Sequence, residues 1–138
     1  MAEAALALGF AYLGFKGAAL REAGIRELAE QARAGHVAEL DAADAAFSRC
    51  IALSAQRPPA APAGAVFAST NREMIAVAWK GQAASALTRA AAARDVGHAQ
   101  DAQGWAAGAL RALDAADRAF PSSDTAILRQ LAEQIVQG

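Results

Sequence analysis

The sequence predicts an all-α protein: two long antiparallel helical hairpins, arranged as a four-helix bundle or a helical repeat, followed by a short C-terminal helix. Alanine, the strongest helix former, dominates the 138-residue chain. Apolar residues recur at steps of three and four, the spacing of one helix face. The segment LDAADAAF at 40–47 returns as LDAADRAF at 113–120, 73 positions along the chain. Such self-similarity is typical of repeated helical units, and the length suits a single domain over residues 1–138.

The first hairpin is expected over residues 1–56. Its first helix is predicted at about 2–34 and ends at Gly35. One stripe of small and apolar residues runs along it: Leu6, Phe10, Leu13, Gly17, Leu20, Gly24 and Leu28. A second helix is predicted at about 36–55, with one side formed by Leu40, Ala43, Phe47 and Cys50 or Ile51. The short turn between the two helices makes them antiparallel neighbours.

A proline-rich linker is expected at residues 57–68, because three prolines and a glycine fall within residues 58–64 and cannot be helical together. The second hairpin and the terminal helix are expected over residues 69–138. The third helix can be capped by a polar residue at 69–71 and ends near Gly97. Pro121 stops the fourth helix, and a short fifth helix starts at Ser123 or Asp124.

The composition argues against several classes of function. Thirteen basic and fourteen acidic residues leave a net charge of −1, without the basic patch that nucleic-acid and membrane-surface binders use. The uncharged run at 4–15 is too short to span a bilayer and lacks the positive start of a signal peptide. The single cysteine, Cys50, fits a reducing cytoplasm. We therefore expect a cytoplasmic protein that neither binds nucleic acid nor spans a membrane.

Three short runs resemble the tetratricopeptide repeat. The run LGFAY at 8–12 is similar to the L-G-x-x-Y signature of that repeat's first helix, and A-x-x-x-F at 43–47 and 116–120 is similar to the signature of its second. The resemblance implies a fold of stacked helix pairs. The family's unit is about 34 residues, whereas the period here is 73. Ala5 stands where the repeat has tryptophan, and the third helix lacks the L-G-x-x-Y run.

The repeated segment carries two carboxylate pairs, Asp41 with Asp44 and Asp114 with Asp117. The spacing i, i+3 puts both members of a pair on one helix face, and inward-facing pairs can bind metal or transfer protons. On an alanine-rich helix such residues are more simply structural or solvated. We expect the structural role.

Two matching turns carry a histidine and an acid, His36 with Glu39 and His98 with Asp101. Together they would supply enough ligands for a divalent ion if the turns met, but a histidine there is more simply the start of the next helix. Cys50 lies on an apolar helix side and is interpreted as a buried, inert thiol. Phosphate-loop and nucleophile motifs are absent from the sequence. We expect no enzyme activity, no cofactor and no bound metal.

The aromatic residues of the first helix are the stronger clue to function. Phe10, Tyr12 and Phe15 point in three directions around the helix, so one partner helix cannot cover them all. Either the rest of the bundle wraps this segment, or these residues and Lys16 form an interface. We expect a non-enzymatic module for protein–protein interaction or self-assembly, whose partner is another protein or a second copy.

The alternative is a sensor or carrier that holds an apolar small molecule between the hairpins. Trp79 and Trp105 are the residues expected to line such a pocket. Bundle interiors do host sites of this kind.

Overall fold

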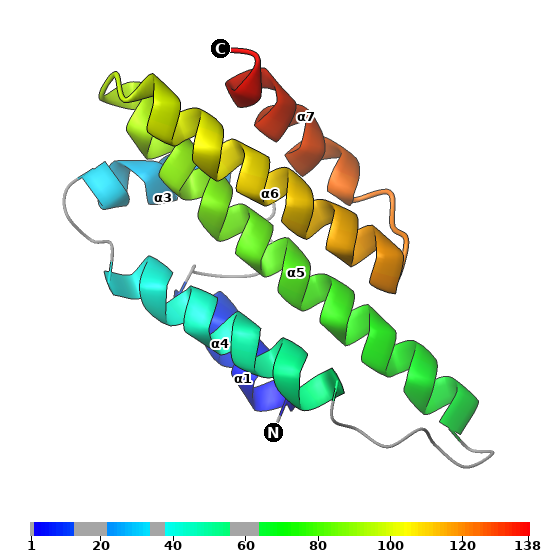
Figure 1. The fold of residues 1–138 in the computed structure, drawn as a ribbon. Helices are drawn as coiled ribbons and strands as arrows, with labels where there is room; N and C mark the ends of the chain where they lie inside the picture. The colour runs from blue at the N-terminus through cyan, green and yellow to red at the C-terminus, as the bar shows by residue number, and fades with distance from the viewer. Residues whose placement is uncertain (1, 13–21, 34–37, 56–63) are drawn as a thin grey trace.

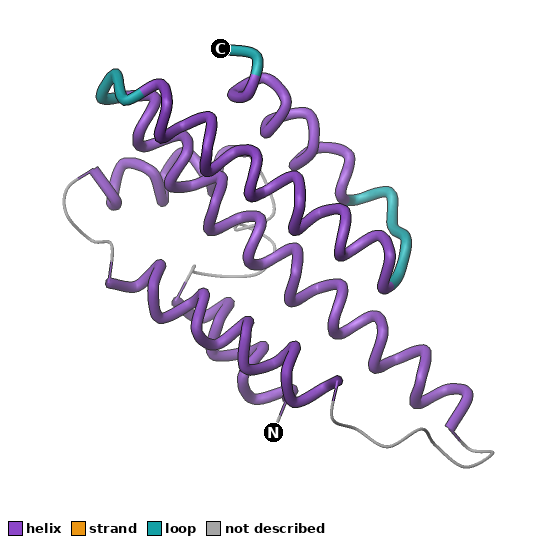
Figure 2. The backbone as a smooth tube through the Cα atoms, viewed as in Figure 1, coloured by secondary structure: helices purple, strands orange, loops and turns teal. Residues whose placement is uncertain are grey.

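The computed structural model describes residues 2–12, 22–33, 38–55 and 64–138, and all regular structure within them is α-helical (Figure 2). The expected all-α class is thereby confirmed. The helices are α1 (Ala2–Tyr12), α3 (Glu22–Arg33), α4 (Ala38–Ala55), α5 (Gly64–Asp95), α6 (Ala99–Ala119) and α7 (Thr125–Val136).

The longest of the described helices, α5, runs through the middle of the molecule (Figure 1). With 32 residues it is about 48 Å long. Helices α6 and α7 lie on one side of it and α4 and α1 on the other, while α3 packs on α5 and α7. Helix α5 therefore contacts every other described helix, which explains why its apolar residues are not confined to a single face.

The core between α1, α4 and α5 is built around Phe47. Its ring is fully buried and meets Phe10 of α1 edge to face, with the ring centres 4.9 Å apart. Gly9 of α1 and Gly81 of α5 both lie against this ring. A Cβ atom added to either glycine would come within 3.0 Å of the ring atoms. The two glycines thus allow three helices to close around one aromatic side chain.

A second core joins α5, α6 and α7, with Ile25 of α3 at one end. Its α5–α6 seam is mostly alanine, so the two helices approach closely. The buried residues of this seam are Ala83, Leu87, Ala90, Ala102, Ala106, Ala109 and Leu113. Helix α7, the expected fifth helix, closes the core through Leu128, Leu131, Ala132 and Ile135.

The turn between α5 and α6 follows the expected use of Gly97. This residue has φ = +82°, a conformation that glycine adopts without strain. The Gly97 amide donates to the Arg94 carbonyl and the His98 amide to the Ala93 carbonyl, which is the Schellman pattern of helix termination. Helices α5 and α6 can then lie antiparallel along their shared seam.

The expectation of one helix over residues 2–34 was wrong. Helices α1 and α3 lie in different places in the molecule: α1 packs mainly on α4, whereas α3 packs on α5 and α7 (Figure 1). The linker predicted at 57–68 also extends too far, because α5 already begins at Gly64. After Pro62 no proline prevents helix formation, so residues 69–71 lie inside the helix instead of capping it.

Candidate functional site

An open groove lies between α4 and α6, with α5 as its floor. Helices α4 and α6 both pack on α5 but do not contact each other in the described part of the chain. The groove has a volume of about 680 Å³. Its lining residues are Asp44, Ser48, Trp79, Gln82, Ala86, Gly104, Trp105, Gly108, Arg111, Ala112, Ala115 and Arg118.

Both tryptophans line this groove, so the structure brings together the two residues that the sequence suggested for a ligand pocket. Trp79 comes from α5 and is half-buried against the core shared with α6. Trp105 comes from the first half of α6 and is 42% exposed. A large aromatic side chain left exposed in a groove is typical of a binding surface.

Arg89 holds one end of the groove together. Its Nη2 atom donates to Asp41 Oδ1 at 2.7 Å and to Asp44 Oδ2 at 3.1 Å, so α5 is tied to α4. Its guanidinium carbon lies 4.8 Å from the centre of the Trp105 ring, a cation–π arrangement that reaches α6. Arg89 is itself only 14% exposed. The orientation of Trp105 is therefore supported by a buried cation.

Among the described residues that line the groove, Asp44 is the only acidic one. Burial raises its pKa above the ordinary value of 3.8, although the nearby Ser85 hydroxyl and the charge of Arg89 act in the opposite direction. Gln82 of α5 donates to this wall, with its Nε2 atom 2.7 Å from Ser48 Oγ. The α4 side of the groove is thus polar, and its polar groups are already engaged.

The α6 side of the groove follows a broad stripe of the helix, about 140° wide, from Trp105 through Gly108 and Ala115 to Arg118. Arg111 lies on the same stripe, and neither arginine makes an ion pair with a residue that the structure describes. Both are exposed to solvent. Among the described residues, these two positive charges of the groove therefore have no ion-pair partner.

The glycines of this stripe do not serve packing. A Cβ added at Gly104 would meet nothing within 4 Å, and one at Gly108 would touch only the end of Arg111 at 3.6 Å. Glycine inside a helix costs about 1 kcal/mol relative to alanine. Their effect is to leave the α6 backbone uncovered beside Trp105.

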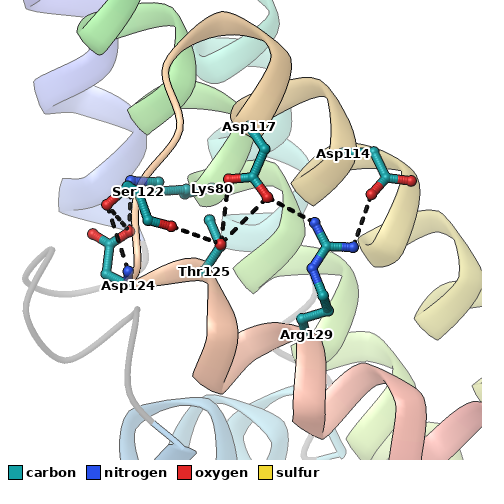
Figure 3. Close-up of polar contacts among 7 residues, drawn as sticks. All are labelled: Lys80, Asp114, Asp117, Ser122, Asp124, Thr125 and Arg129. Carbon is teal, nitrogen blue, oxygen red and sulfur yellow. Dashed lines mark hydrogen bonds and ion pairs between the residues drawn. The ribbon is translucent and has the colours of Figure 1, made fainter.

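The second copy of the repeated segment forms an equivalent clamp elsewhere. Arg129 of α7 donates to Asp114 at 2.8 Å and to Asp117 at 2.9 Å (Figure 3). Its hydrogen bond to Asp114 is the main cause of a raised Arg129 pKa. Thr125 joins the same network, with its hydroxyl 3.3 Å from Asp117. Each Asp pair therefore binds one arginine of a neighbouring helix, which agrees with the structural role expected for these carboxylates.

The turn into α7 is held by a further ion pair. The buried Lys80 of α5 reaches the Asp124 carboxylate at 2.7 Å, and Ser122 donates to the same oxygen at 2.7 Å (Figure 3). Asp124 is the N-cap residue of α7. This contact fixes the start of α7 on the side of α5 that faces away from α4.

The other residues suggested by the sequence lie apart from the groove. Phe10 is 6% exposed and belongs to the core around Phe47. The side chain of Tyr12, together with Phe15 and Lys16, falls outside the described residues, so the interface suggested for these aromatics stays a prediction.

The histidine turns are only partly described. His36 is outside the described residues, and its expected partner Glu39 is exposed. His98 is exposed at the N-cap of α6, where its backbone carbonyl accepts from Ala102, and Asp101 is exposed as well. No group of three or more potential metal ligands occurs among the described residues. Cys50 is buried, as expected.

Sequence reasoning missed Arg89, Arg111 and Arg118. The i, i+7 spacing of Arg111 and Arg118 is visible in the sequence and places the two arginines on one helix face. Arg89 had no such signal, because its partner Asp41 is 48 positions away.

No family model, curated protein or solved structure matches this chain. Within the described residues, none of the helices combines the length and the apolar character needed to cross a membrane.

Proposed function

We propose that this chain is a non-enzymatic protein-interaction module that holds a segment of a partner protein in the groove between α4 and α6. The observation that carries the proposal is the meeting of Trp79 and Trp105 in one open groove, with Trp105 42% exposed. Tryptophan and arginine are enriched among the residues that dominate binding energy at protein interfaces.

The shape and lining of the groove favour a protein segment over a small apolar molecule. Small-ligand sites bury most of the ligand in a cavity with mainly apolar walls. Here the groove is partly open to solvent, and five of its lining residues are polar or charged: Asp44, Ser48, Gln82, Arg111 and Arg118. A mixed apolar and polar lining of this kind is typical of a protein–protein interface.

The state of the polar groups supports binding over catalysis. Asp44 is held by Arg89 at 3.1 Å, and Ser48 is engaged by Gln82. A general base needs a proton to abstract within hydrogen-bonding reach and a free lone pair with which to abstract it. The described residues that line the groove include no histidine or cysteine.

Site-specific photo-crosslinking in cells of the source organism tests the proposal. A benzophenone amino acid is introduced at Ser48, an exposed residue of the groove wall, and separately at Gln130, an exposed residue of α7. We expect a discrete protein adduct from position 48, lost when Trp105→Ala is added, and none from position 130. Equal adducts from both positions, or an adduct indifferent to Trp105, would contradict the proposal.

Self-association through α1 is a second candidate function, favoured by a specific observation. Apart from Glu3 near its start, helix α1 is apolar around most of its circumference, yet within the described part of the chain only one side packs on α4 and α5. The side away from them exposes Ala4, Ala7, Leu8 and Ala11, which are spaced as one helix face with Glu3 at its start, and Leu8 is 51% exposed. A second copy of the same helix would bury this face.

Leu8→Asp should therefore reduce the mass measured by light scattering at high protein concentration, while Ile127→Asp, at an equally exposed site on α7, should not. A monomer at all concentrations for the unmodified chain removes this candidate and leaves the groove proposal standing.

A further inference from the structure

The groove has a chemical preference that follows from its charges, and this inference rests on the proposed function. Asp44 is the single acidic side chain among the described residues that line it, and it is paired with Arg89, which it shares with Asp41. Arg111 and Arg118 have no ion-pair partner among the described residues. The free groove is therefore electropositive along its α6 wall, although the whole chain carries a net charge of −1.

We infer that the occupant of the groove is an acidic protein segment that also carries apolar side chains. Its apolar side chains would lie on Trp79 and Trp105, and its carboxylates would pair with Arg111 and Arg118. Guanidinium groups bind carboxylates with two parallel hydrogen bonds, which gives such pairs directional specificity.

The positions of the charges define what the segment must look like. Trp105, Arg111 and Arg118 follow one another along α6 and line the same wall, with Trp105 at one edge of that wall and the two arginines together at the other edge. The two arginines are seven residues apart on the helix, which corresponds to about 10 Å along its axis. The segment should present an apolar residue at one end and carboxylates spaced by about the same length.

The uncovered backbone at Gly104 and Gly108 agrees with this arrangement. Neither glycine is required by its neighbours, and both lie beside Trp105 on the wall that the segment would follow. Side chains at these positions would narrow the groove next to its main apolar contact. Their absence lets a second backbone approach the α6 helix closely.

The residues of the α4 wall contribute little to which charge the bound segment must carry. Ser48 and Gln82 are neutral and bonded to each other, and the Asp44 carboxylate is held by Arg89. A basic segment would meet Arg111 and Arg118 without compensation and would be rejected by like-charge repulsion.

Selection from a peptide-display library of random sequence tests this inference. The target is the full chain, and a parallel selection against Trp105→Ala identifies the peptides that need the groove. We expect the Trp105-dependent peptides to be enriched in Asp and Glu next to aromatic or aliphatic residues. Against the double variant Arg111→Glu with Arg118→Glu, the enriched peptides should instead carry Lys and Arg.

The control is Arg72→Glu with Arg94→Glu, which makes the same change of charge at two exposed sites of α5 outside the groove. One selected acidic peptide is then synthesised and titrated into each variant. We expect the groove double variant to bind it at least about tenfold more weakly, since two charge pairs become repulsive. The control double variant should bind it nearly as well as the unmodified chain, and affinity should fall with added salt. Unfolding curves of both double variants check that they are folded.

The possible outcomes separate this inference from the proposed function. Trp105-dependent peptides without an acidic bias, or an affinity that the groove and control variants lower equally, would overturn the acidic preference and leave the groove as a protein-binding site. A library that yields no Trp105-dependent peptide, together with no adduct from position 48, would overturn both.

Discussion

At the scale of single residues, the contact between Phe47 and two glycines is the most sensitive point of the fold. A Cβ at Gly81 would lie within 3.0 Å of three atoms of the Phe47 ring, and a Cβ at Gly9 would lie 2.6 Å from Phe47 Cε1. Phe47 is fully buried and cannot move without disturbing Phe10. This place in the core has no room for one further methyl group.

We therefore predict that Gly81→Ala lowers the free energy of unfolding by about 1–3 kcal/mol, the range for overpacked cores. Gly104→Ala is the matched control, because it changes another helical glycine where nothing lies within 4 Å. It should raise the stability by up to about 1 kcal/mol. Urea unfolding measures both. Similar changes of the same sign would mean that Phe47 does not constrain position 81.

The Asp44 carboxyl group gives a prediction on pH at the same scale. Burial raises its folded-state pKa above 3.8, so the native state binds this proton more tightly than the unfolded chain does. The resulting stability is fully present below the unfolded pKa and is lost as the pH rises through the folded pKa. Asp44→Asn keeps the shape of the side chain and removes the titration.

Urea unfolding of the two proteins across this pH range measures the effect. The unmodified chain should lose stability relative to Asp44→Asn as the pH rises from below 3.8 towards neutrality. A gain relative to the variant would show that Arg89, and not burial, dominates the pKa of Asp44.

Residues of the groove could be predicted from the sequence when the signal lay within one helix, and not when it depended on contacts between distant segments. Spacing was enough to suggest that Trp79 and Trp105 share a pocket, because each lies on a periodic helix face. It could not supply Arg89, whose contacts with Asp41 and Asp44 cross 48 and 45 positions. Polar contacts over such distances depend on how the helices pack, and periodicity within one helix does not report this.

At the scale of helices, each copy of the repeated segment ties its helix to a neighbouring helix. In each copy, an Asp pair at i, i+3 binds one arginine of the next packed helix: Arg89 for Asp41 and Asp44, Arg129 for Asp114 and Asp117. The two clamps differ in burial, since the Arg89 side chain is 14% exposed and that of Arg129 is 30% exposed.

This difference predicts unequal effects of removing the arginines. Arg129→Ala should lower stability by about 1 kcal/mol, as expected for a partly exposed ion pair. Arg89→Ala should cost about 2 kcal/mol, because it leaves Asp44 half-buried without its cation and removes the contact with Trp105. Thermal and urea unfolding of the two variants compare them directly. Equal losses would mean that burial does not distinguish the clamps.

Helix ends that are set by a nearby glycine or proline were predicted well. The sequence did not predict that α1 and α3 pack on different helices. Gly97 has the positive φ that ends α5, and α6 ends at Ala119, just before Pro121. The stripe over residues 2–34 suggested one helix, yet α1 and α3 bury their apolar residues against different helices. Periodicity identifies an apolar face but does not say which helix covers it.

At the scale of the whole molecule, the groove is a consequence of the central position of α5. Two cores form on its two sides, one around Phe47 with α1 and α4, the other along the alanine seam with α6 and α7. Because α4 and α6 are both attached to α5 and not to each other, a space remains between them. Trp105 and the two free arginines lie on the α6 wall of that space.

The sequence could predict the helical class and the chemistry of individual side chains, but not this groove. Its walls come from parts of the chain that are far apart, Asp44 and Ser48 from one and Arg111 and Arg118 from the other. They face one another only through the packing of both helices on α5. A binding surface of this kind is a property of the tertiary structure.

The most direct test of the binding groove is the mapping of NMR chemical shifts on the labelled chain. The probe is a synthetic peptide that corresponds to the partner segment captured from position 48. We predict that the largest shifts fall on the Trp105 indole and on the amides of Ser48, Gln82, Gly108 and Ala115. Shifts concentrated on α1 or α7, with the Trp105 indole unchanged, would contradict the account.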